Sequence, residues 1–385
     1  MNAELEKLYK KQTKIAPAVA PRSKGAVLVE TEDILRVVYD VYTTVQDTSS
    51  ADVMVNLLFL HGSGMNRSIW EYYAAYLPKY IGSDRNWSIH KIVTMDQVTH
   101  GDSAELNRSQ LGVNFDWADG ARDACRVSEA EFMPKRSPKC INIVIGHSMG
   151  GFQALCCGVL SPFMFDQIIV IEPVVYVPHV DNKEGVTIVP PKFHKALLSK
   201  MDDTFESMDD FKTFMNTRSF YRNSHPEIVE RMTNFEAVAL PNGRVRAKIS
   251  KEQNIICYLT LDPTAKWLIG SLPYIKTPVY GIVGGVSTWC PPENQQLLVS
   301  RLPEYHQDFI PKGDHLVNLE DPESCLQKIT EYISDCISKI DLGSGTSTHD
   351  PPITSDSHRK RLFARKFSQF ENERVKDGDI ILAKL

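Results

Sequence analysis

The chain has 385 residues and a formal net charge of −5; 42% of its residues are hydrophobic and 24% are charged. A chain of this length can bury a large core. Its net charge is slightly negative, whereas nucleic-acid-binding proteins typically have an excess of basic residues. We therefore expect a soluble globular protein without a nucleic-acid partner. The eight cysteines include no C-x-x-C pair, so we expect buried apolar side chains, with no metal site and no cofactor.

The N-terminal segment, residues 1–25, contains lysines but no apolar run of signal-peptide length. No later stretch offers the roughly 18 uncharged apolar residues of a membrane span. We interpret residues 1–25 as an extension that precedes the folded core. Residues 26–44 then alternate between apolar and polar side chains, which predicts an antiparallel strand pair with its turn near residues 31–33.

Apolar runs of strand length follow, separated by stretches of helical length. They are VNLLFLHG (55–62), HKIVTMDQ (90–97), CINIVIGHS (140–148), DQIIVIEP (166–173), PVYGIVGG (278–285) and YHQDFIP (305–311). Continuous apolar strands are buried on both faces. The pattern therefore predicts an α/β fold with a mostly parallel central sheet and helices on both faces.

Residues 174–275 interrupt this alternation with mainly helical patterns, which predicts an inserted helical lid. Residues 26–173 and 276–340 are then the two parts of the core. The apolar side chains of the lid could supply an acyl pocket or only the core of the lid itself. They are Met201, Phe205, Met208, Phe211, Phe214, Met215 and Phe220.

Residues 341–385 begin as a turn-rich linker and continue into a predicted amphipathic helix at 358–376. Phe363, Phe367 and Phe370 share one face of this helix, beside basic side chains. Two interpretations stay open. The helix packs on its own domain, or it makes peripheral contact with a membrane surface.

A glycine-flanked serine, Gly146-His147-Ser148-Met149-Gly150, marks the junction of a predicted strand and a predicted helix. G-x-S-x-G in this position is the nucleophile-elbow pattern, in which the serine adopts a strained backbone conformation and the glycines avoid steric collisions. A neutral serine is a weak nucleophile and needs a histidine base that is oriented by an acid. We therefore predict that Ser148 is a nucleophile.

The base and the acid must follow this serine along the chain, in the order acid and then histidine. His315, on a glycine-containing loop after the last strand, is the histidine with that placement. Ser287 stands where an aspartate is common, and no carboxylate follows until Glu293. We predict Glu172, at the end of the strand after the serine, as the acid. The alternative is a structural glutamate that holds the lid hinge or pairs with a cation.

Two backbone amides should stabilise the oxyanion of the tetrahedral intermediate. The first is the N–H of Met149, directly after the nucleophile at a helix N-terminus. The second is expected in the loop His61-Gly62-Ser63-Gly64, where we choose the N–H of Ser63. The sequence assigns no substrate-binding residue.

The segments NLLFLHGSGMNRSIWEYY, MDQVTHGDSA, VIGHSMGGFQAL, IEPVV and GDHLVNLEDP resemble the α/β-hydrolases with a helical lid, in the same order. The resemblance spans residues 26–340. It implies a serine hydrolase with Ser148 as nucleophile, His315 as base, and Ser63 and Met149 as oxyanion donors. With WCPPENQ and the C-terminal end, it further implies a lipase or acyl esterase that acts on lipid-derived acyl esters.

Two other functions are compatible with this resemblance. One is an acyl-CoA thioesterase of the same fold, since scattered cations can hold coenzyme A. The other is a non-catalytic protein of this fold that binds lipids or membranes.

The last three residues, Ala383-Lys384-Leu385, resemble the C-terminal S-K-L signal for peroxisomal import. They predict an import receptor as a partner and import from the cytosol into the peroxisomal matrix. The alternative is a chance tripeptide on a cytosolic protein.

Overall fold

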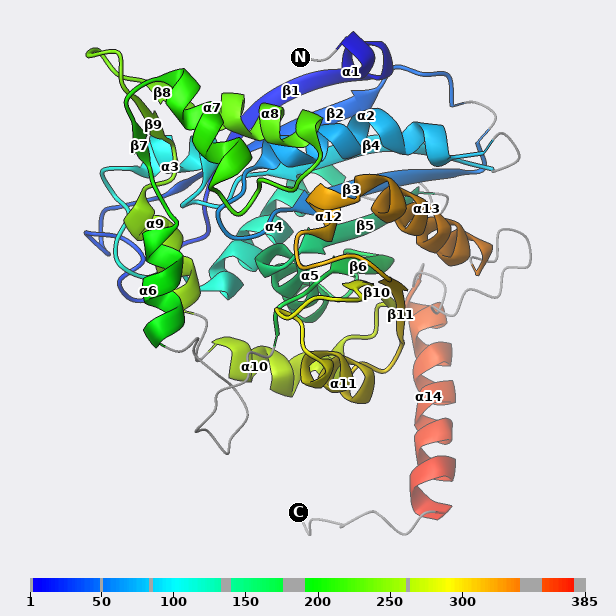
Figure 1. The fold of residues 1–385 in the computed structure, drawn as a ribbon. Coiled ribbons are helices and arrows are strands. Elements are labelled where there is room, and N and C mark those ends of the chain that lie inside the picture. Colours follow the sequence, from blue (N-terminus) through cyan, green and yellow to red (C-terminus); the bar gives the residue numbers. More distant parts are fainter. Residues whose placement is uncertain are drawn as a thin grey trace. The chain divides into compact units, whose positions relative to one another are not determined.

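The computed structural model describes residues 3–48, 51–82, 86–132, 140–175, 191–260, 264–339 and 355–376. The chain divides into two compact units, Met1–Ile337 and Ser338–Leu385. The first unit contains both the central sheet and the lid (Figure 1).

Apolar runs of the sequence become the inner strands of the first unit. The strands of its central sheet are β1 (Tyr9–Pro17), β2 (Arg36–Thr44), β3 (Val53–Leu60), β4 (Trp87–Met95), β5 (Cys140–His147), β6 (Gln167–Ile171), β10 (Val279–Gly284) and β11 (Tyr305–Ile310). Their order is β1-β2-β4-β3-β5-β6-β10-β11. β1 and β2 are antiparallel to their neighbours, and the strands from β4 to β11 pair in parallel. The predicted mostly parallel sheet is confirmed.

The N-terminal segment differs from the prediction. The structure places β1, inside the expected extension 1–25, at the edge of the sheet, paired with β2 from Tyr9↔Thr44 to Pro17↔Arg36. Residues 26–44 therefore do not form a strand pair of their own, since only β2 within them is a strand. The expected partner strand lies earlier in the chain because the backbone groups of β2 are satisfied by β1.

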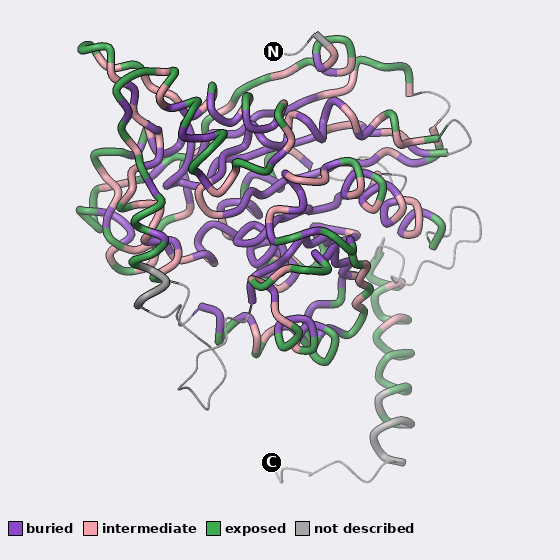
Figure 2. Tube along the Cα trace, viewed as in Figure 1, coloured by how far each residue is buried: buried purple, intermediate pink, exposed green. Residues whose placement is uncertain are grey.

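Helices cover both faces of this sheet (Figure 1). In the core they are α1 (Ala3–Leu8), α2 (Trp70–Tyr80), α3 (Gly101–Asn107), α4 (Trp117–Phe132), α5 (Met149–Leu160), α10 (Thr264–Ser271), α11 (Pro292–Arg301), α12 (Val317–Glu320) and α13 (Pro322–Ser338). Alternate residues of β3 show the two layers. Leu58 and Leu60 join the cluster that contains Phe152 of α5, whereas Phe59 packs on Trp70 of α2 with ring centroids 4.9 Å apart. Figure 2 shows the central strands as mostly buried.

The lid contains helices α6 (Pro191–Ser199), α7 (Met208–Thr217), α8 (Pro226–Glu236) and α9 (Lys251–Leu259). In contrast, α10 lies inside the expected lid bounds 174–275 but packs on the core through Ala265 and Leu268. The lid also has a small sheet in the order β7-β9-β8, formed by β7 (Thr204–Phe205), β8 (Ala237–Ala239) and β9 (Val245–Ala247). Phe205 stacks on Phe211 with ring centroids 4.5 Å apart, and both are buried. These side chains form the core of the lid, which was one of the two interpretations.

The second unit contains α14 (Asp356–Lys376), which covers the predicted tail helix. Its Phe363 and Phe367 side chains stack at 5.9 Å and are 69% and 50% exposed. Residues 383–385 lie outside the described residues, so the expected targeting signal stays a prediction. None of the described helices combines the length and the apolar character needed to cross a membrane.

Candidate active site

The serine elbow joins β5 to α5 in a strained turn. Ser148 has φ 53° and ψ −114°, a backbone conformation that residues other than glycine rarely adopt. A Cβ at Gly146 would collide with the carbonyl oxygen of Gly150, and a Cβ at Gly150 would collide with that of Leu60. The predicted backbone strain and the steric need for both glycines are therefore confirmed.

Three predicted side chains meet beside this elbow. His315 Nε2 lies 3.0 Å from Ser148 Oγ, and His315 Nδ1 lies 3.2 Å from Glu172 Oε2. Ser148 and His315 are each 8% exposed, while Glu172 is fully buried. The three residues come from the ends of β5, β6 and β11, because the carboxyl ends of parallel strands share one edge of the sheet. This hydrogen-bonded line is the arrangement in which a histidine activates a serine.

Glu172 is held from three directions. The backbone N–H of Gly284 donates to Oε1 at 2.6 Å, and the Ser287 hydroxyl donates to Oε2 at 2.5 Å. With the His315 ring, these donors serve both carboxylate oxygens, as a fully buried carboxylate requires. Glu172 has φ 48°, so its backbone is strained like that of the serine. Sequence reasoning noted Ser287 as the place of a missing acid but not its contact with Glu172.

The backbone and ring of His315 are also fixed. Its N–H donates to Asp314 Oδ1 at 2.7 Å, so the Asp314 carboxylate contacts the backbone of its neighbour. Burial holds the pKa of His147 well below its usual value, and this neutral ring donates from Nε2 to the His315 carbonyl at 2.8 Å. The Trp289 ring stacks on the imidazole of His315, with centroids 5.0 Å apart and planes inclined by 16°. No sequence pattern indicated the roles of His147 and Trp289.

The loop with the expected oxyanion donor Ser63 lies against the elbow. A Cβ at Gly62 would lie 3.2 Å from Ser148 Cβ, so the glycine allows this close approach. The Ser63 hydroxyl donates to Met149 Sδ at 3.4 Å. Ser63 and Met149 are thus neighbours beside Ser148; their role as oxyanion donors stays a prediction.

Two buried histidines hold this loop in place. His61 Nε2 accepts from the N–H of Gln97 at 3.1 Å, and His100 Nε2 accepts from the N–H of Gly64 at 3.0 Å. Burial lowers the pKa of His61 to about 4 and that of His100 well below its usual value. Both rings are therefore neutral at pH 7 and can accept these hydrogen bonds.

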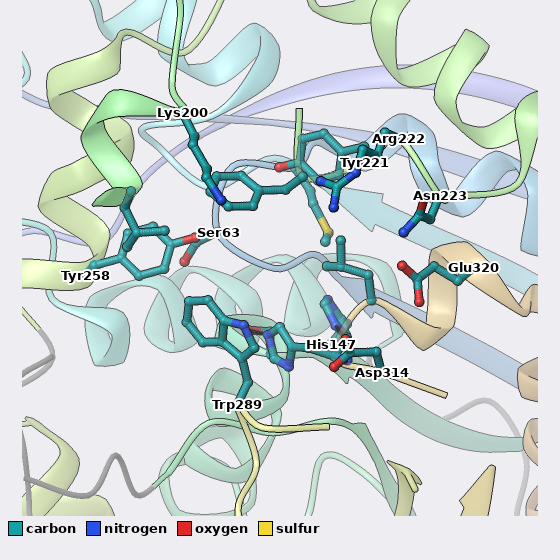
Figure 3. A pocket seen from close by; sticks show the side chains of 16 residues that line it. Ser63, His147, Lys200, Tyr221, Arg222, Asn223, Tyr258, Trp289, Asp314 and Glu320 are labelled. Carbon is teal, nitrogen blue, oxygen red and sulfur yellow. Dashed lines mark hydrogen bonds between the residues drawn. The ribbon is translucent and has the colours of Figure 1, made fainter. Parts of the chain in front are cut away.

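A cavity of about 230 Å³ opens above the serine (Figure 3). It is bounded by core residues such as Trp289 and by lid residues. The residues that line it are Ser63, Met65, His147, Ser148, Leu197, Lys200, Phe220, Tyr221, Arg222, Asn223, Tyr258, Trp289, Asp314, His315, Leu316 and Glu320. Of the seven apolar lid residues considered for an acyl pocket, Phe220 lines this cavity. Four others line a second cavity of about 60 Å³ in the lid.

Glu172, Cys290 and His315 bring an oxygen, a sulfur and a nitrogen within 4.8 Å of one another, a group that could hold a metal ion. Burial and the Glu172 carboxylate hold the pKa of the Cys290 thiol well above its usual value. At neutral pH the sulfur is thus protonated, whereas metal binding requires the thiolate. The carboxylate and the ring already bond to each other. We therefore interpret the group as part of the serine site.

The chain belongs to the alpha/beta hydrolase family, whose family model matches residues 57–327. It is 38% identical over 380 residues to the peroxisomal membrane protein LPX1 of Saccharomyces cerevisiae, covering 95% of this chain and 96% of that protein. The crystal structure of the peroxisomal alpha-beta-hydrolase Lpx1 from that yeast matches with a TM-score of 0.82, over 95% of this chain and 98% of that one.

More distant structures share the fold. The E-2-(acetamidomethylene)succinate hydrolase is 18% identical and matches with a TM-score of 0.57 over 84% of this chain and 99% of its own. Both the predicted fold and the family resemblance are confirmed. The protein is thus a hydrolase of the α/β fold, similar to a peroxisomal member of the family.

Proposed function

We propose that the protein is a serine carboxylic-ester hydrolase that acts on lipid-derived acyl esters through an acyl-enzyme on Ser148. The observation that carries the proposal is the line of hydrogen bonds from Ser148 through His315 to Glu172. Ser148 and His315 line a cavity of about 230 Å³ that lies between the core and the lid.

The geometry supports a two-step reaction. His315 Nε2 accepts the proton of Ser148 Oγ as this oxygen attacks the ester carbonyl, and Glu172 stabilises the charged ring. The amides of Ser63 and Met149 stabilise the oxyanion. The alcohol then leaves with the proton from His315. In the second step a water molecule gives a proton to His315 and attacks the acyl-enzyme. The acid is released as His315 returns this proton to Ser148 Oγ, which restores the serine hydroxyl and the neutral ring.

Covalent labelling tests the nucleophile. A fluorescent fluorophosphonate should label the wild-type protein and should not label Ser148→Ala. Ser300→Ala, at an exposed serine of α11, is the matched control and should label like the wild type. An unlabelled wild type, or equal labelling of Ser148→Ala, would show that the protein is not a serine hydrolase of this mechanism. The former outcome would favour a non-catalytic lipid-binding protein.

We also propose that the protein resides in the peroxisomal matrix and binds the import receptor through Ala383-Lys384-Leu385. The name of its yeast relative supports the peroxisome, and the choice of the matrix rests on the terminal tripeptide. A fluorescent protein fused before residue 1 should give a punctate peroxisomal pattern, and deletion of the last three residues should make it diffuse. A pattern that stays punctate after the deletion would exclude these residues as the signal.

A further inference from the structure

Two basic side chains of the lid line the cavity above Ser148. Lys200 directly follows α6, and Arg222 lies between α7 and α8. Figure 3 shows both side chains on the lid side of the cavity, whereas Asp314 lies on the opposite side. The two cations thus face the space that a substrate bound at Ser148 occupies.

Neither cation has an acidic partner among the residues that the structure describes, at the 4.0 Å limit for an ion pair. Lys200 Nζ lies 5.9 Å from the centre of the Phe220 ring. Arg222 donates one hydrogen bond, from Nη1 to the Ser219 carbonyl at 3.2 Å. Burial raises the pKa of the Glu320 carboxyl, and the positive charge of Arg222 acts to lower it, although these two side chains make no ion pair. Among the described residues, no acidic side chain thus occupies the remaining hydrogen-bond donors of Lys200 and Arg222.

We propose that Lys200 and Arg222 form a binding site for an anionic group of the substrate, a carboxylate or a phosphate. This inference rests on the proposed hydrolase function and narrows its substrate class to esters or thioesters that carry a negative charge. Arginine and lysine bind both anions through charge-assisted hydrogen bonds. Lys200 and Arg222 are exposed at the rim of the cavity, beside the aromatic side chains of Phe220 and Tyr221.

The anionic group can come from either end of the substrate. A carboxylate can end the acyl chain, as in a half-ester of a dicarboxylic acid. Phosphates can belong to the leaving group, as in a thioester of coenzyme A. The chemistry that Lys200 and Arg222 recognise is the same in both cases.

Two matched pairs of substrates separate these sources. The first pair is p-nitrophenyl pentanoate and mono-p-nitrophenyl glutarate, which differ in the charged end of the acyl chain. The second pair is butanoyl-CoA and the neutral thioester of butanoate with N-acetylcysteamine. We expect the wild type to prefer the anionic member of at least one pair by about tenfold in kcat/KM, mainly through KM.

The double variant Lys200→Gln/Arg222→Gln should remove this preference and leave the turnover of the neutral member nearly unchanged. Lys195→Gln/Lys212→Gln removes two exposed lid charges outside the cavity lining and should keep the preference. Two results would overturn the inference: equal kcat/KM within both pairs, or a preference for the anionic member that survives in the double variant. In either case, turnover of the neutral substrates would still support the hydrolase function. The absence of turnover for all four substrates would overturn both.

Discussion

Ser287 donates a hydrogen bond to Glu172 from the loop position where many proteins of this fold carry an aspartate. Glu172 reaches the same point from the end of β6, and the Gly284 amide serves its other oxygen. A hydroxyl thus stands at the position of the missing aspartate and donates a hydrogen bond that orients the glutamate. A glutamate with both oxygens bonded is held in one rotamer and can keep the His315 ring in place.

Replacement of Ser287 should slow the reaction without weakening substrate binding. Ser287→Ala leaves one buried carboxylate oxygen with one donor fewer, and we expect kcat to fall by about tenfold with KM unchanged. Ser287→Thr keeps the hydroxyl and should retain most of the rate. Steady-state kinetics with a neutral ester measures both constants. Glu172→Gln should lower kcat by orders of magnitude and serves as the reference for complete loss of the acid. A Ser287→Ala variant with normal kcat would contradict a positioning role.

The central residues of the site were predictable because each one has a local signal. Ser148 has flanking glycines, His315 has a glycine-containing loop after a strand, and Glu172 ends an apolar strand. The structure brings these three residues together. Trp289, Lys200 and Arg222 have no such signal, since their place near the serine depends on how the loops and the lid pack.

At the scale of elements, the inner strands were predictable because burial on both faces gives each of them a continuous apolar run in the sequence. β1 was missed because it is an edge strand with mostly polar side chains, and its exposed positions outnumber its buried ones. Backbone pairing with β2 and ion pairs hold it in the sheet. Lys11 contacts Asp40 at 3.0 Å, and Lys14 contacts Glu131 at 2.7 Å. Lysines are typical of edge strands, where they oppose aggregation.

A buried glutamate links α8 of the lid to the core. Glu236 accepts hydrogen bonds from Asn66 Nδ2 at 2.8 Å and from the N–H of Ile249 at 2.7 Å. Burial, the dominant cause, raises its pKa from 4.5 to about 7. The unfolded chain releases this proton near pH 4.5 and the folded protein near pH 7. Folding is therefore favoured below this interval and becomes less favourable as the pH rises through it.

The pH dependence of stability should reveal this glutamate. From pH 4.5 to 7 its ionisation should lower the free energy of unfolding by up to about 3 kcal/mol. Glu236→Gln is neutral at every pH, so its stability should decline less between pH 5 and 8 than that of the wild type. Urea unfolding of both proteins at several pH values measures the difference. Parallel curves would mean that Glu236 keeps its charge throughout.

At the scale of the whole molecule, the first compact unit holds the sheet, the lid and every described residue of the serine site. A chain truncated after residue 340 should therefore keep its Tm within about 2 °C and keep its turnover of a neutral ester. Thermal unfolding and kinetics of the two chain lengths provide the comparison.

The same truncation separates the two interpretations of α14. A clear fall in Tm would mean that its phenylalanine face packs on the first unit. An unchanged Tm together with the loss of binding to anionic vesicles would support contact with a membrane surface.

The meeting of β6 and β10 also bears on how the acid responds to substitutions. Glu172 bonds through its N–H to Ile282 of β10 at 2.9 Å, and Ser287 follows that strand closely. The ends of two neighbouring strands thus meet at one carboxylate, so a substitution in the loop after β10 acts on the acid that β6 contributes.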